Sequence, residues 1–119
     1  MTTPGNSPVA LITGAAVRLG AATAKLLHQN GFNIIIHCNR SIAEANLLAE
    51  TLNAERDDSA QVLQADLADT SAVLKLGADA IAIWERLDVL VNNASAFYPT
   101  PLNEINEQQW DDLFASNAR

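Results

Sequence analysis

The sequence predicts an α/β fold, a doubly wound parallel sheet with helices on both faces. Three observations predict it. Strand-like apolar runs alternate with helical patterns four times along the chain, a glycine turn joins the first strand to the first helix, and 49% of the 119 residues are apolar. Because crossovers between parallel strands are right-handed, we expect the strand order 3-2-1-4.

The first strand, helix and glycine turn predict a site for a diphosphate. Residues 9–12 are apolar and largely β-branched, as in a buried parallel strand, and a helical pattern begins near Leu19. Gly14 stands between them, and Gly20 follows six residues on, at the start of the helical pattern. Glycine lets a phosphate approach the backbone, and the free amides of the first helical turn point at the anion. The alternative is a purely structural turn.

The end of the second strand indicates which dinucleotide would bind. This strand covers residues 33–37, and NAD-binding folds usually carry an acidic residue about 20 residues after the glycines. Here no acid occurs before Glu44, whereas Arg40 and Ser41 can bind a 2′-phosphate. The pattern favours NADP over NAD. The alternative is that Arg40 is a solvated surface residue and Ser41 only caps the next helix, whose start has the capping-box form.

His37 and Cys38 precede Arg40 and are interpreted as strand-end packing. Neither has metal-ligand partners at useful spacing, so no metal site is predicted. Cys38 is the single cysteine of the sequence, so no disulfide can form within the chain.

The third and fourth strands are expected at residues 60–65 and 87–91. Asp66 and Leu67 follow the third strand, where a carboxylate can accept from an adenine amino group. The alternative is a turn that starts the next helix at Asp69. The fourth strand precedes a loop, residues 92–102, that contains two prolines. Because ligands bind at the carboxyl ends of such strands, Phe97 is placed to stack on a flat substrate, unless it merely packs under its loop.

A further helix is expected from Glu107 onward. Asn117 is polar on its apolar face, and a buried amide needs partners. Bonding between this helix and the sheet is one explanation of that residue.

Composition excludes several classes of function. The formal charge of −7 and a pI near 4.5 argue against nucleic-acid binding. No apolar run approaches the roughly 18 residues of a membrane span. Residues 1–7 lack a basic start and an apolar segment, so we interpret them as a flexible tail of a cytoplasmic protein rather than a signal peptide.

The fourth strand raises a difficulty. In the expected order it lies at an open edge of the sheet, although its residues are of a buried type. We therefore expect residues 8–119 to be one half of a Rossmann-type domain that continues beyond 119.

Together these motifs resemble the short-chain dehydrogenase/reductase family over essentially the whole chain. The glycine turn is similar to the family's T-G-x-x-x-G-x-G, with Arg18 in place of the middle glycine. Within the family the chain looks like the pteridine reductases. The features that carry this are Arg18, the segment His-x-Asn-Arg-Ser at 37–41, and Asn-Asn-Ala-Ser-Ala-Phe-Tyr-Pro-Thr-Pro at 92–101, where generic members have glycine at Ser95.

The resemblance implies an NADPH site. Arg18 would contact the cofactor phosphates, Arg40 and Ser41 the 2′-phosphate, Asp66 the adenine, and Asn93 the ribose of the nicotinamide. The full cofactor-binding set implied is Gly14, Arg18, Leu19, Gly20, Asn39, Arg40, Ser41, Asp66, Leu67, Asn93 and Ala94.

The resemblance also implies a substrate and a reaction. Arg18 and Ser95 would bind a pterin, Phe97 would hold it against the nicotinamide, and Asn117 would support a proton-relay water. The implied reaction is hydride transfer to a dihydropterin or dihydrofolate in a homo-oligomer, a tetramer in the family. The proton-donor tyrosine and its lysine are absent from the 119 residues, so we expect this portion alone to be inactive. A reductase of another carbonyl substrate, or a non-catalytic NADP-binding module, are the alternatives.

Overall fold

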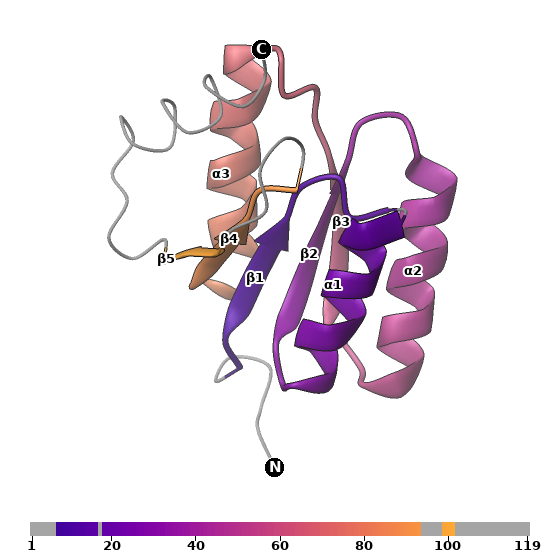
Figure 1. The fold of residues 1–119 in the computed structure, drawn as a ribbon. Helices are drawn as coiled ribbons and strands as arrows, with labels where there is room; N and C mark the ends of the chain where they lie inside the picture. Colours follow the sequence, from indigo (N-terminus) through magenta and orange to yellow (C-terminus); the bar gives the residue numbers. More distant parts are fainter. Residues whose placement is uncertain (1–6, 17, 94–98, 102–119) are drawn as a thin grey trace.

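The computed structural model describes residues 7–16, 18–93 and 99–101, and a parallel sheet lies at its centre (Figure 1). Its parallel strands are β1 (Val9–Ile12), β2 (Asn33–Cys38), β3 (Ala60–Gln64) and β4 (Val89–Val91). They lie in the order β3-β2-β1-β4. The predicted strand order and Rossmann-like α/β fold are confirmed. Ser7, at the end of the predicted tail, is buried, and residues 1–6 lie outside the described part.

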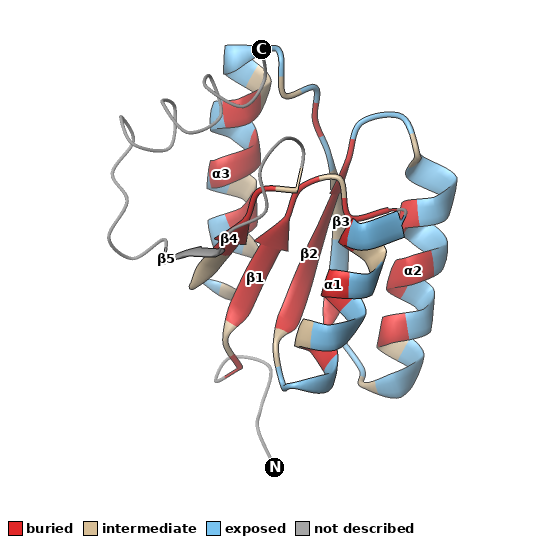
Figure 2. Ribbon diagram, in the orientation of Figure 1, coloured by how far each residue is buried: buried red, intermediate tan, exposed pale blue. Residues whose placement is uncertain are grey.

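Helices cover both faces of the sheet. Helices α1 (Arg18–Gln29) and α2 (Ile42–Glu55) lie side by side on one face, and α3 (Thr70–Trp84) covers the other (Figure 1). Strands β1 and β2 are buried along their length, whereas β3 is buried only in part and the outer sides of the helices are exposed (Figure 2). Among the described helices, none has the length and apolarity that crossing a membrane requires.

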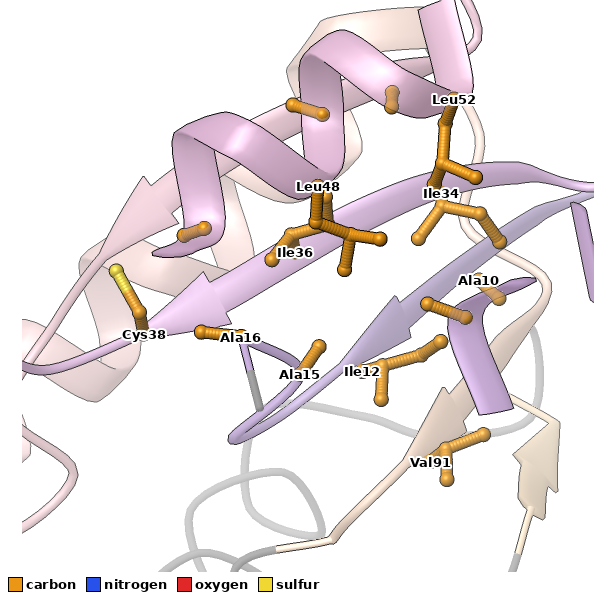
Figure 3. Close-up of a cluster of buried hydrophobic side chains, with 14 residues drawn as sticks. Ala10, Ile12, Ala15, Ala16, Ile34, Ile36, Cys38, Leu48, Leu52 and Val91 are labelled. Carbon is orange, nitrogen blue, oxygen red and sulfur yellow. The ribbon is translucent and has the colours of Figure 1, made fainter. Parts of the chain in front are cut away.

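Successive strand residues supply the two cores. Ile12, Ile34 and Ile36 point toward α1 and α2, where they meet Leu48 and Leu52 (Figure 3). This alternation follows from the pleat of a strand, which sends neighbouring side chains to opposite faces.

The second core lies under α3. Leu11 and Ile35 pack there against Val73, Leu76 and Ala80 of the helix. Both faces of β1 and β2 are therefore apolar, which explains why these strands read as continuous hydrophobic runs rather than alternating ones.

The outer side of β4 differs from the prediction. Residues 99–101, expected in a loop, form a short strand, β5 (Pro99–Pro101), that pairs antiparallel with β4. The expectation of an unpaired β4 edge was therefore wrong for this structure. Proline lacks the N–H that continues a ladder, so it suits an edge strand. Strand β4 itself begins at Val89, two residues later than expected.

The two predicted helix caps had different outcomes. Asp69 caps α3, because its carboxylate accepts from the amides of Ser71 and Ala72. Ser41 occupies the N-cap position of α2, but its side chain makes no capping hydrogen bond. The capping-box interpretation of Ser41 was therefore wrong, because its hydroxyl does not cap the start of α2.

A polar cluster closes the amino edge of the sheet. Arg56 donates to the carbonyl oxygens of Phe32 (2.6 Å) and His28 (3.1 Å). The buried hydroxyl of Ser59 donates to the carbonyl of Arg56 and lies 2.7 Å from Nε2 of His28. Burial, and next the charge of Arg56, lower the pKa of His28. The cluster ties the ends of α1 and α2 to the starts of β2 and β3.

We predict a large stability difference between two leucines of α2. Leu52 is fully buried against β2, whereas Leu47 is 64% exposed. Leu52→Ala should lower the free energy of unfolding by about 2–5 kcal/mol, through lost burial and the cavity left behind. Leu47→Ala, the matched control, should stay within about 0.5 kcal/mol. Urea unfolding followed by circular dichroism measures both, and equal losses would contradict the core assignment.

Candidate functional site: the glycine turn and the carboxyl edge of the sheet

The turn between β1 and α1 depends on two glycines. Gly14 adopts φ +61°, a left-handed conformation that costs a glycine little. Gly20 lies in the first turn of α1, against the backbone of the turn. A Cβ at position 20 would stand 2.3 Å from the carbonyl oxygen of Gly14 and 2.8 Å from Cα of Ala15. No real side chain fits there, so Gly20 sets how closely the helix approaches the turn.

Arg18 begins α1 with a backbone that disfavours arginine. Its φ is +56°, in the left-handed region, and its side chain is exposed. A non-glycine residue in that region costs on the order of 1 kcal/mol. Position 18 is where the motif T-G-x-x-x-G-x-G has its middle glycine. A glycine there would adopt this left-handed backbone conformation without strain. Arginine stands there at a conformational cost.

His37 joins the ends of three strands. Its Nδ1 accepts from the amide of Gly14 at 3.0 Å, and its Nε2 lies 2.9 Å from the carbonyl oxygen of Ala65 after β3. An amide only donates and a carbonyl only accepts, so the ring is neutral with its proton on Nε2. Burial lowers the pKa of His37, and the bond to Ala65 opposes that shift. The strand-end packing interpretation missed these two polar bonds.

Two amides of the turn are therefore not available to a ligand. The amide of Gly14 is bound by the imidazole of His37, and the amide of Ala15 donates to the carbonyl of His37 at 3.1 Å. At the start of α1, the amides of Leu19 and Gly20 precede any intrahelical acceptor. An anion at this edge would thus meet the amides of the helix start rather than those of the first turn residues.

The end of β4 is bonded to the same turn. The hydroxyl of Thr13 donates to Oδ1 of Asn92 (3.0 Å) and accepts from the amide of Asn93 (2.9 Å). Nδ2 of Asn93 lies 3.5 Å from the carbonyl oxygen of Gly14. Asn93 therefore lies beside Gly14 and Gly20, and it lines the turn from the β4 side.

The segment after β2 is polar and open. Asn39 and Arg40 are exposed, and Ser41 is half-buried at the start of α2. Nε2 of Gln64 donates to the carbonyl of Asn39 at 2.7 Å, which holds this segment to the end of β3. The positive end of the α2 dipole is directed at the same place. The first described acid of α2, Glu44, is also exposed.

Asp66 and Leu67 lie at the end of β3. Oδ1 of Asp66 accepts from the amide of Ala68 at 2.9 Å, and the carbonyl of Asp66 accepts from the amide of Asp69. Asp66 thus builds the turn into α3, which was the alternative to an adenine contact. Leu67 packs against the core under α3.

Four of the expected site residues lie outside the described part of the chain: Ala94, Ser95, Phe97 and Asn117. Within the part that is described, no three His, Cys, Asp or Glu side chains gather where they could hold a metal ion. The thiol of Cys38 is buried and burial raises its pKa. The residues brought together by the structure are those of the turn, His37 and Asn93.

Residues 8–119 match the sequence model that describes the short chain dehydrogenase family. The chain belongs to this family. Its parallel sheet, glycine turn and Asn93 beside that turn agree with the match. The family takes its name from dehydrogenases, which are oxidoreductases.

Named relatives extend the comparison. Pteridine reductase 1 of Leishmania tarentolae is 43% identical, covering 99% of this chain and 52% of the relative. The 3-oxoacyl-[acyl-carrier-protein] reductase FabG of Staphylococcus aureus is 33% identical, over 92% of this chain and 44% of the relative. A short-chain dehydrogenase/reductase of Pestalotiopsis microspora is 34% identical over 93% of this chain. The chain therefore spans about half the length of these curated relatives.

We predict that Gly20→Ala disturbs the glycine turn. The added methyl would meet the Gly14 carbonyl and the Ala15 backbone, so α1 must move away from the turn. The free energy of unfolding should fall by about 1–3 kcal/mol, as in other overpacked sites. Lys25→Ala, an exposed position on the same helix, should change it by less than about 0.5 kcal/mol. Denaturant unfolding of both variants is the measurement, and a Gly20→Ala protein as stable as Lys25→Ala would contradict the close approach.

Proposed function

We propose that this chain is the cofactor-binding half of an NADPH-dependent reductase whose substrate is a dihydropterin or a dihydrofolate. The observation that carries the cofactor choice is the end of β2. It has an exposed arginine and no acid, beside the start of α2. A ribose 2′-hydroxyl would find no carboxylate there, whereas a 2′-phosphate would find Arg40, Ser41 and the positive end of a helix dipole.

The turn fits the diphosphate of such a cofactor. Gly20 keeps side-chain atoms out of the space between α1 and the turn, and the first amides of α1 have no intrahelical acceptor. Nicotinamide supplies the hydride chemistry when bound, and the chain supplies position and polarity. In this proposal Asn93 lies on the nicotinamide side and Asp66 on the adenine side.

The presence of arginine at position 18 is evidence for a bound anion and for a role that only arginine can fill. Its backbone conformation would suit glycine better, so the side chain gives a benefit that outweighs a cost of about 1 kcal/mol. We assign it to the cofactor phosphates and, beyond them, to the pterin. A guanidinium can bridge a phosphate and a flat heterocycle because it is planar and offers several donors.

The substrate class rests on the relative from Leishmania tarentolae, named a pteridine reductase, and on the loop that contains Ser95 and Phe97. A reductase of another carbonyl compound is the second candidate, because the FabG relative acts on a 3-oxoacyl substrate by its name. A Tyr-x-x-x-Lys proton-donor pair does not occur in the 119 residues. The complete reaction is therefore proposed for the whole protein, as is its assembly into a homo-oligomer.

Cofactor preference tests the first half of the proposal. The protein should bind NADPH more tightly than NADH, and Arg40→Asp should reverse this preference, since a carboxylate repels the 2′-phosphate and suits the ribose hydroxyl. Fluorescence titration of the reduced cofactors gives both dissociation constants. Lys25→Asp changes the net charge equally at an exposed site on α1 and should leave the preference in place. Tighter NADH binding by the unmutated protein would overturn the NADPH assignment.

Substrate choice tests the second half. Phe97→Ala in the complete enzyme should lower kcat/KM for a dihydropterin at least about tenfold, or about 1.4 kcal/mol, by removing the ring that stacks on the substrate. Phe97→Tyr keeps the ring and should retain most of the activity. NADPH affinity should change little in both variants. Unaltered pterin turnover in Phe97→Ala would show that Phe97 packs under its loop rather than stacking on the substrate, and the substrate assignment would lose that support.

A further inference from the structure

One buried polar side chain has no part in the proposed function so far. His37 is 3% exposed, and both ring nitrogens have partners on other strands' loops. One partner, the amide of Gly14, belongs to the glycine turn itself. The other, the carbonyl of Ala65, immediately precedes Asp66. The ring therefore lies between the diphosphate end and the adenosine end of the proposed cofactor site.

We propose that neutral His37 is a positioning residue for NADPH, because it holds the glycine turn in the conformation that receives the cofactor's diphosphate. This inference rests on the proposed function and assigns a role to a residue that touches the turn rather than the ligand. His37 acts through two hydrogen bonds. The amide of Gly14 donates to its ring, and the amide of Ala15 donates to its backbone carbonyl.

Two hydrogen bonds hold the turn to His37. With the amides of Gly14 and Ala15 both bound to His37, the left-handed backbone at Gly14 is held in place before any ligand arrives. The contact of Gly20 with Gly14 then fixes the start of α1 against that turn. A turn held in advance loses less conformational freedom on binding, which improves affinity.

Protonation would break this arrangement. An imidazolium carries N–H on both nitrogens, so Nδ1 would face the amide of Gly14 with a donor against a donor. The charged side chains on the segments that meet at the ring are Arg18, Arg40, Glu44 and Asp66, and all four are exposed. Burial of the ring therefore lowers its pKa, and the bond to Ala65 opposes that shift. The ring is neutral at pH 7, and the turn is expected to loosen only in more acidic solution.

Three variants test the proposal through the dissociation constant of NADPH between pH 5 and 8. His37→Gln offers an acceptor and a donor that do not titrate. His37→Phe fills the space without either. His28→Gln is the matched control, since His28 is the other histidine of the chain and lies at the opposite edge of the sheet.

At pH 7.5, His37→Phe should weaken NADPH binding at least about tenfold, and His37→Gln less than about threefold. Below the pKa of His37, the unmutated protein should lose affinity by up to about tenfold per pH unit relative to His37→Gln. The 2′-phosphate of the cofactor also titrates near pH 6, but it does so in both proteins and cancels in their ratio. His28→Gln should keep the pH profile of the unmutated protein.

A second readout needs no cofactor. In ¹⁵N-glycine-labelled protein, the Gly14 amide resonance should move with pH in the unmutated chain and stay fixed in His37→Gln, so the test stands even where His37→Phe fails to fold. Identical NADPH affinities and pH profiles in the unmutated protein and His37→Gln would overturn the positioning role alone. An unmutated protein that binds neither NADPH nor NADH would overturn the proposed function, and this inference with it.

Discussion

The close approach of α1 to the glycine turn is the constraint on which the rest of the site depends. At position 20 there is no space for even a methyl group between the helix and the Gly14 carbonyl. Because the helix starts so near the turn, its first amides reach the carboxyl edge of the sheet, where β2, β3 and β4 also end. His37 and Thr13 then bind those strand ends to the same turn. The close contact of Gly20 with the Gly14 carbonyl thus places the start of α1 beside the ends of β2, β3 and β4.

The electrostatics of the site are local. The chain as a whole carries a formal charge of −7, which repels an anionic nucleotide at long range. In the proposed function, attraction to such a nucleotide must come from exposed Arg18 and Arg40 and from helix-terminal amides. Such short-range attraction is orientation-dependent, so it selects a pose as well as a charge.

The fold was predictable because its first two strands contain short, continuous apolar runs. Runs such as residues 9–12 and 34–36 are apolar and buried, and the right-handed crossover rule then leaves one strand order. The bonds of His37 were not predictable, because a polar residue at the end of a buried strand has many possible partners. The signal was present, since a buried imidazole must satisfy two nitrogens. The β4 edge was missed because two prolines within residues 92–102 favoured a loop over a strand.

The polar cluster of His28, Arg56 and Ser59 lies at the amino edge of the sheet, whereas the candidate site lies at the carboxyl edge. The two edges therefore have different roles. The cluster binds helix ends and strand starts at the amino edge, far along the strands from the glycine turn. Anchoring at that end leaves the loops of the opposite edge free to change length and chemistry while the sheet stays intact. A scaffold organised in this way can diversify, because a lineage can exchange one loop at the carboxyl edge for another and keep the same sheet and glycine turn; reductases with different names resemble this chain.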